Sequence, residues 1–259
     1  MRHPVRNTLL ALLALVLLAL TWQAFGISQV PTPETPEPAE EASQPLTPPA
    51  TVTSPPEPVA LTPEPTIALP SSLNLAVPFT SQAPHGNWDA AHEEYCEEAS
   101  LLMAARYFRG QTIAGPDDTE AELARIAAWQ ESTFGYFEST TAEETARIGR
   151  ELLDLDVTVS LNVEAETIRR HLNDGALVII PAAGRRLGNP YFRAPGPIYH
   201  MLVVKGYTET GAFITNDPGT RRGAEFMYPA DALLAAIHDY NGGNVEEGRR
   251  VILVVRPNR

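Results

Sequence analysis

The sequence of 259 residues contains only one cysteine, Cys96, and only one lysine, Lys205. A single thiol cannot form an internal disulfide, so a disulfide framework is excluded. The shortage of lysine accompanies a net charge of −13, which argues against nucleic acid or anionic lipid as a partner. The chain also lacks a glycine-rich phosphate loop, a calcium loop and clustered His and Cys at metal-ligand spacing. We therefore predict neither a cofactor nor a bound metal.

The longest apolar run lies near the N-terminus, where Arg2 and Arg6 precede twelve apolar residues, 9–20. The positive charges hold the N-terminal end in the cytoplasm, so this pattern predicts export of the rest of the chain. The run is shorter than the roughly 20 residues that usually span a bilayer, but no clear cleavage site comes after it. We expect residues 1–26 to anchor the chain in the cell membrane with the domain outside the cytoplasm. Secretion after cleavage of a signal peptide is the alternative.

Proline is concentrated in residues 27–70, which hold 13 of the 24 prolines and six glutamates but no basic residue. Such a segment has too little apolar surface to offset its ordering entropy, which predicts an extended, disordered linker. The remaining residues, 71–259, are enough for one domain with a sizeable core.

Hydrophobic periodicity predicts helices in the first half of that domain. A largely buried helix is expected from Tyr95 to Phe108, and another over residues 164–173. Two capping boxes, each a threonine followed three residues later by a glutamate, predict helices that reach about residues 130 and 153: Thr119 with Glu122, and Thr141 with Glu144.

The second half of the domain reads mainly as strands. Short apolar or alternating runs predict them at 157–159, 176–181, 199–207, 212–215, 226–228 and 251–255. A helix is expected between the last two, from Pro229 to about His238. Helices followed by an antiparallel sheet predict an α+β fold.

Cys96 stands where the first of these helices begins. Taken alone, a single cysteine is more simply interpreted as a small buried hydrophobe, so the case for catalysis rests on its combination with His200 and Asp217. Unpaired N–H groups at a helix N-terminus lower a thiol pKa, and the thiolate is the nucleophile. His200 opens a predicted strand, and Asp217 follows a hairpin 17 residues later. Antiparallel pairing returns Asp217 to the neighbourhood of His200, where a carboxylate fixes the orientation of an imidazole base.

Two neighbouring positions modify this interpretation. Glu97 and Glu98 follow the thiol directly, and carboxylates near a thiolate raise its pKa. They also suit a helix N-terminus as surface charges.

Gln82 lies upstream in an extended segment, and its amide is the best candidate to stabilise an oxyanion together with the Cys96 backbone N–H. A surface glutamine in a loop is the alternative.

Four motifs together resemble the bacteriocin-type double-glycine leader peptidase family, in particular its stand-alone, exported relatives. The motifs are Val77-Pro78-Phe79 with Ser81-Gln82, Cys96-Glu97-Glu98-Ala99-Ser100, Tyr199 to Tyr207, and Asn216-Asp217-Pro218-Gly219. The resemblance implies a papain-like cysteine peptidase fold over roughly residues 73–256. It also implies that Cys96 is the nucleophile, His200 the base, Asp217 the orienting group and Gln82 the oxyanion donor.

Three functions fit these residues. The first is a membrane-tethered or secreted thiol peptidase or amide hydrolase that acts on a peptide or cell-envelope substrate. The second is a binding module that keeps the fold without turnover, which the acidic neighbours of the thiol favour. The third is acyl transfer through the same thioester, which differs only in the acceptor. Arg185, Arg186 and Arg193 lie in a loop, 182–197, which either rims the cleft and selects acidic substrates or is an ordinary solvated loop.

Overall fold

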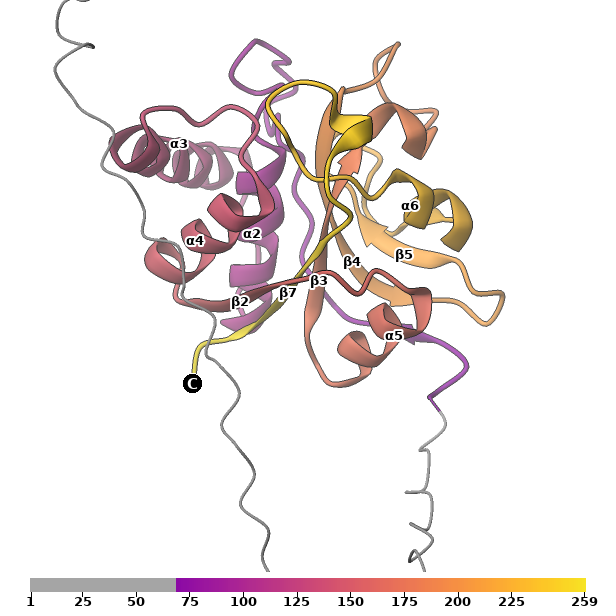
Figure 1. Ribbon diagram of the computed structural model, residues 1–259. Coiled ribbons are helices and arrows are strands. Elements are labelled where there is room, and N and C mark those ends of the chain that lie inside the picture. Colours follow the sequence, from indigo (N-terminus) through magenta and orange to yellow (C-terminus); the bar gives the residue numbers. More distant parts are fainter. Residues whose placement is uncertain (1–68) are drawn as a thin grey trace, which may run out of the picture. The chain divides into compact units, whose positions relative to one another are not determined.

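The computed structural model describes residues 69–259 (Figure 1). The expected N-terminal anchor or signal, 1–26, and nearly all of the expected linker lie outside these residues. The helices are α2 (Cys96–Phe108), α3 (Pro116–Phe134), α4 (Ala142–Leu152), α5 (Ala165–Asn173) and α6 (Ala230–Ala236), with short 3-10 turns η1 (Gly184–Leu187) and η2 (Val245–Glu247). The strands are β1 (Leu73–Asn74), β2 (Leu155–Ser160), β3 (Leu177–Ala183), β4 (Tyr199–Tyr207), β5 (Phe213–Asn216), β6 (Phe226–Tyr228) and β7 (Ile252–Pro257).

All strand pairs of the described sheet are antiparallel, in the order β2-β7-β3-β4-β5-β6, with β1 added to β4. Central strand β4 is buried along its whole length. Its side chains alternate between two cores: Met201 and Val203 face one, Leu202 and Val204 the other. The α+β arrangement expected from the sequence is confirmed.

Helices cover both faces of the sheet. Helices α2, α3 and α4 lie on one face, and α5 and α6 on the other (Figure 1). Helix α2 is buried from Cys96 to Ala105, because it lies between the sheet and the helices α3 and α4. Burial on nearly all sides explains why this helix is apolar around its circumference rather than along one stripe. The structure therefore places the thiol at the end of a rigid element.

One of the two predicted capping boxes is confirmed and the other is wrong. Thr141 caps α4, and both reciprocal bonds with Glu144 are present. Thr119 caps nothing, because α3 begins earlier, at Pro116 after Gly115. Proline at the first helical position has no N–H to leave unpaired, so it starts a helix without a side-chain cap. The Thr119 hydroxyl instead donates back to the Gly115 carbonyl at 3.0 Å.

The loop segment expected over 182–197 is also shorter than predicted, because β3 continues to Ala183 and η1 follows directly. Among residues 69–259, no helix is long and apolar enough to cross a membrane.

Candidate active site

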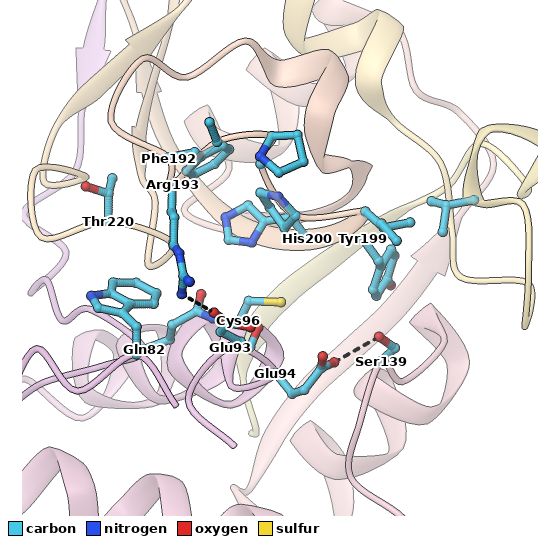
Figure 2. A pocket seen from close by; sticks show the side chains of 18 of the residues that line it. Gln82, Glu93, Glu94, Cys96, Ser139, Phe192, Arg193, Tyr199, His200 and Thr220 are labelled. Carbon is cyan, nitrogen blue, oxygen red and sulfur yellow. Dashed lines mark hydrogen bonds and ion pairs between the residues drawn. The ribbon is translucent and has the colours of Figure 1, made fainter. Parts of the chain in front are cut away.

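Cys96 is the first residue of α2 and borders a cavity of about 1050 Å³ (Figure 2). The side chain is only 4% exposed, and a backbone N–H of Met201 faces its sulfur. Met201 follows His200 in β4, so the sulfur lies against the start of that strand. His200 borders the same cavity. The thiol and the imidazole, 104 positions apart in the sequence, thus border the same cavity.

The His200 ring is paired with Asp217. His200 Nε2 lies 2.7 Å from Asp217 Oδ1, and both side chains are buried. The two residues come together because β4 pairs antiparallel with β5, and Asp217 immediately follows β5. The other ring nitrogen, Nδ1, has no hydrogen-bond partner within residues 69–259. This leaves Nδ1 available to a group in the cavity.

Three further groups hold the Asp217 carboxylate. Oδ2 accepts hydrogen bonds from the Tyr228 hydroxyl at 2.5 Å and from Asn189 Nδ2 at 3.0 Å. Oδ1 also accepts from the Gly219 backbone N–H at 2.9 Å. Burial opposes ionisation of Asp217, but the charge and hydrogen bonds of His200 and the bond from Tyr228 outweigh it and hold its pKa below the ordinary value. These contacts therefore favour the ionised form of the carboxyl group beside His200.

Sequence reasoning missed Asn189 and Tyr228. Each lies far from Asp217 along the chain, and nothing in Gly188-Asn189-Pro190 or in the short run 226–228 marks them as partners of a carboxylate. Asn216, which precedes Asp217 in the same motif, has a structural role. Its amide donates to the carbonyls of Val77 and Pro78 and so holds the segment that leads to Gln82.

Gly219 and Phe192 enclose the imidazole. A Cβ atom at Gly219 would lie 2.8 Å from His200 Cε1 and 2.8 Å from the Phe192 ring. Phe192 packs edge-on against the imidazole, with ring centroids 5.2 Å apart. The glycine of the Asp-Pro-Gly turn is thus required by the space that the imidazole occupies, and the ring has little room to turn.

The thiol does not donate to His200 in this arrangement. Cys96 Sγ donates to Glu97 Oε2 at 2.9 Å. Burial, the Glu97 charge and this hydrogen bond raise the pKa of the Cys96 thiol well above its ordinary value. The expected lowering of the thiol pKa by the helix N-terminus is therefore outweighed here.

Glu97 and Glu98 are not surface charges. Both are buried on α2, which corrects the expectation that they complement the helix dipole from solvent. Glu98 Oε1 accepts from Gln130 Nε2 at 2.5 Å, and this bond ties α2 to α3. Burial is the main cause of the raised pKa of both carboxyl groups.

Gln82 borders the cavity, and its amide is engaged by the backbone. Nε2 donates to the backbone carbonyls of His92 at 2.8 Å and of Glu93 at 3.0 Å, and Oε1 is buried without a partner. Both amide hydrogens are thus committed to the segment before α2. The Gln82 backbone N–H donates to the Pro218 carbonyl, which joins this segment to the Asp217 turn.

His92 is buried, although its neighbours in the sequence are mostly polar. It is 5% exposed, with Nδ1 2.7 Å from Asp89 and Nε2 3.0 Å from Glu120. Because Glu120 belongs to α3, the pairing fixes the segment before Cys96 to that helix.

Arginines line one side of the cavity. Arg193, Arg221 and Arg222 border it, whereas Arg185 and Arg186 of the predicted rim do not. Arg193 forms an exposed ion pair with Glu93 at 2.9 Å (Figure 2), and Arg186 pairs instead with Glu246. Of the three loop arginines considered from the sequence, only Arg193 therefore borders the cavity. Within residues 69–259, no cluster of three or more His, Cys, Asp or Glu is arranged to hold a metal.

Comparison with known proteins places the chain in a family. No curated protein matches it. Several solved structures resemble it. One is a C39-like peptidase from Bacillus anthracis, 16% identical over 73% of this chain and 99% of that chain, with a TM-score of 0.47. Another is a fragment of prointerpain A from Prevotella intermedia, 11% identical over 75% of this chain and 74% of that chain, with a TM-score of 0.45.

A sequence profile of the Peptidase_C39 like family matches residues 74–241, more than half of the chain. The matched range includes Cys96, His200 and Asp217. It confirms the relation to peptidases with a papain-like α+β fold that the four sequence motifs predicted. The chain belongs to the Peptidase_C39 like family.

Proposed function

We propose that this domain is a thiol peptidase or related amide hydrolase that acts on a peptide or cell-envelope substrate. In this proposal Cys96 is the nucleophile, His200 the general base and acid, and Asp217 the group that orients the imidazole. The observation that carries the proposal is the buried 2.7 Å pair of His200 and Asp217 on the cavity wall that also presents Cys96. A protein that only binds a ligand has no need of this combination.

The ring pairing indicates the direction of proton transfer. Because His200 Nε2 is engaged with Asp217, Nδ1 is the atom that takes the thiol proton. Cys96 Sγ must first turn from Glu97 toward that nitrogen. The thiolate then attacks the substrate carbonyl carbon, an S–C bond forms, and the imidazolium donates its proton to the leaving nitrogen as the C–N bond breaks.

The second half of the cycle returns the site to its starting state. Water gives a proton to His200 Nδ1 as its oxygen attacks the thioester carbon. The S–C bond then breaks, and the imidazolium returns that proton to the sulfur. If an amine rather than water attacks, the same steps give acyl transfer. The acceptor alone distinguishes the two reactions.

Stabilisation of the oxyanion rests first on the Cys96 backbone N–H at the start of α2. A tetrahedral oxyanion next to the sulfur is within reach of this donor and of the positive end of the helix dipole. Gln82 contributes only if its amide leaves the carbonyls of His92 and Glu93. A large loss of kcat with unchanged folding in Gln82→Ala supports that movement, and loss of stability without a specific kcat effect assigns Gln82 to holding the segment.

A binding module is the second candidate, and the Cys96–Glu97 hydrogen bond favours it. A thiol held protonated by a carboxylate is a poor nucleophile. The two functions differ in what Cys96→Ala does. Turnover disappears under the first proposal, whereas binding persists under both.

The test is hydrolysis of a quenched-fluorescent peptide library and of isolated cell-envelope material by the folded protein. We expect turnover with the wild type and loss of at least about a thousandfold in Cys96→Ala and His200→Ala. Glu246→Gln, which removes a surface carboxylate paired with Arg186, is the matched control and retains activity. If Cys96→Ala hydrolyses the substrate as fast as the wild type, the proposal is wrong.

We further propose that the domain works outside the cytoplasm, tethered by residues 1–26 through the proline-rich segment 27–70. Arg2 and Arg6 before the apolar run support this topology. Protease added to intact cells or spheroplasts degrades the domain if it is exported. N-terminal sequencing of the mature protein distinguishes the anchor from a cleaved signal.

A further inference from the structure

Glu97 is a buried carboxyl group that the proposed relay leaves without a task, although it touches the nucleophile. Its Oε2 accepts the hydrogen bond from Cys96 Sγ at 2.9 Å, and its Oε1 accepts one from the Thr140 backbone N–H at 3.0 Å. The side chain is 1% exposed. A glutamate in the first turn of a helix usually points to solvent, whereas this one points along the helix end to the sulfur.

The surroundings fix this geometry. The Thr140 carbonyl accepts a hydrogen bond from the Tyr199 hydroxyl at 3.0 Å, and the Thr140 hydroxyl pairs with that of Thr145 at 2.9 Å. The turn before α4 is therefore held between β4 and α4. Because the Thr140 N–H occupies Oε1, a proton on Glu97 belongs on Oε2, where it faces the sulfur.

The charged and titratable groups around Glu97 are acidic, apart from His200. Glu94 precedes α2, Glu98 follows on the same helix, and Tyr199 faces Glu97 and Cys96 from β4. None of the ion pairs within residues 69–259 includes Glu97 or Glu98. A thiolate formed beside an ionised Glu97 would therefore place two negative charges in contact, with only the His200 imidazolium to compensate.

We propose that Glu97 is a third acid–base group of the active site and that Cys96 becomes a nucleophile only when Glu97 carries a proton. This inference rests on the Cys96–His200 relay of the proposed function. With Glu97 protonated, the sulfur releases its proton to His200 Nδ1, and Glu97 Oε2–H donates a hydrogen bond to the resulting thiolate. Glu97 keeps its proton while the S–C bond forms and later breaks.

Ionised Glu97 has the opposite effect. It accepts the hydrogen bond from the thiol, as the structure shows, and keeps the proton on sulfur. Burial above all raises the pKa of Glu97 to about 7, so the change between the two states falls in the neutral range. Below about pH 7 Glu97 is protonated and the thiolate–imidazolium pair forms, and above it the pair reverts to thiol and neutral imidazole.

The experiment measures the rate of Cys96 alkylation by iodoacetamide between pH 5 and 10, which requires no substrate turnover. We expect the wild type to react fastest below pH 7 and about tenfold more slowly at pH 8. One unit above a pKa of about 7, only about a tenth of the sites retain the Glu97 proton. The rate rises again only in strong alkali, where hydroxide removes the thiol proton.

Glu97→Gln replaces the carboxyl group by an amide of the same shape that always donates to the sulfur. We expect its alkylation rate to stay level from pH 6 to 9 and to exceed the wild-type rate about tenfold at pH 8. Glu94→Gln removes a charge from the same neighbourhood without contacting the sulfur, because Glu94 bonds Ser139. Its profile keeps the decrease between pH 6 and 8.

Two results overturn the inference: a wild-type rate that rises continuously to an alkaline plateau, or a decrease above pH 7 that persists in Glu97→Gln. The wild-type profile decides the question even if Glu97→Gln does not fold. His200→Ala separates this inference from the proposed function, because it removes the fast reaction at low pH if the relay is correct. If the decrease in alkylation rate above pH 7 persists in His200→Ala, the role of the Glu97 proton is supported and the Cys96–His200 relay is contradicted.

Discussion

The Tyr228 hydroxyl donates a 2.5 Å hydrogen bond to Asp217 Oδ2, inside the protein and on the side of the carboxylate opposite His200. Tyr228 lies in β6, and Asn189, the second donor to the same oxygen, precedes β4. The carboxylate is thus held from two directions before it meets the imidazole. Tyr228 and Asn189 thus fix Asp217, and through it the buried His200–Asp217 pair at the start of central strand β4.

Tyr228→Phe is expected to destabilise the protein by about 1.5–3 kcal/mol, the usual contribution of a hydrogen bond to a charged group. The hydroxyl helps to keep the pKa of Asp217 low, so its removal raises that pKa. A depressed carboxyl pKa gives stability that is present above the unfolded pKa and lost as pH falls through the folded pKa. In the variant, that loss is therefore complete at a higher pH.

Thermal unfolding of both proteins between pH 3 and 7 measures this shift. Tyr136→Phe is the control, because Tyr136 also bonds a carboxylate, that of Glu144, but at the exposed surface. Its effect should stay below about 1 kcal/mol. An acid transition of Tyr228→Phe at the wild-type pH would contradict the assigned role of the hydroxyl.

Gly219→Ala tests whether the Asp-Pro-Gly turn is shaped by the imidazole. The added methyl group would lie 2.8 Å from His200 Cε1, and its other near neighbour, Phe192, blocks the opposite movement. We expect kcat to fall at least about tenfold with little change in KM, because a displaced base affects the chemical step more than substrate binding. Steady-state kinetics of the variant measure both quantities.

Gly243→Ala is the matched control. Gly243 also borders the cavity, but a Cβ there meets nothing within 4 Å. It should leave kcat within about twofold of the wild type. If kcat falls to the same extent in both variants, crowding of His200 is not the cause of the decrease in Gly219→Ala.

Local signals in the sequence predicted much of this fold. The Thr141–Glu144 capping box, the buried run of β3 and the hairpin of β4 and β5 depend on residues that are near neighbours in the chain. The hairpin also predicted that Asp217 returns to the neighbourhood of His200, because β4 pairs antiparallel with β5. Thr119 misled because Pro116 supplies a competing start signal.

The features that the sequence did not reveal depend on packing between distant segments. Whether Glu97 is solvated or buried is decided by the turn at Thr140, 43 residues away along the chain. Tyr228 and Asn189 converge on Asp217 only once β5, β6 and the loop before β4 are assembled. No periodicity in the chain encodes these contacts. The polar contacts around His200 and Asp217 were therefore less predictable from the sequence than the His200–Asp217 pair itself.

The arginines of the cavity predict a preference for acidic substrates. Arg193, Arg221 and Arg222 border it, and the last two have no ion-pair partner within the described residues. We expect peptides with Asp or Glu near the scissile bond to be cleaved more efficiently than their Asn or Gln counterparts. The preference should be about two- to fivefold per exposed charge pair and should weaken with added salt.

Arg221→Glu with Arg222→Glu should reverse this preference without changing cleavage of neutral peptides by more than about twofold. Arg185→Glu is the control, because Arg185 is exposed in the neighbouring η1 but does not border the cavity. The measurement is the ratio of kcat/KM for each acidic and amide pair. An unchanged ratio in the double variant would show that Arg221 and Arg222 do not determine the preference for acidic substrates.

His92 joins the segment before Cys96 to α3 through Asp89 and Glu120, and this pairing makes stability depend on pH. Burial by itself lowers the pKa of His92, but the hydrogen bonds and charges of the two carboxylates more than offset it and raise the pKa above its ordinary value. A raised histidine pKa gives stability that is complete below the unfolded pKa of about 6.5 and lost as pH rises through the folded pKa.

His92→Gln should therefore cost most stability at pH 5.5 and progressively less at pH 7 and pH 9. Urea unfolding at each pH measures the difference in the free energy of unfolding. The part that remains at pH 9 reports lost packing, since His92 also contacts the Tyr95 ring with centroids 5.3 Å apart. His85→Gln removes a half-exposed histidine paired with Asp117 and should change little at any pH. A cost of His92→Gln that is equal at all three pH values would show that the two carboxylates hold a neutral ring, and that the charge of His92 has no part in fixing the segment before Cys96.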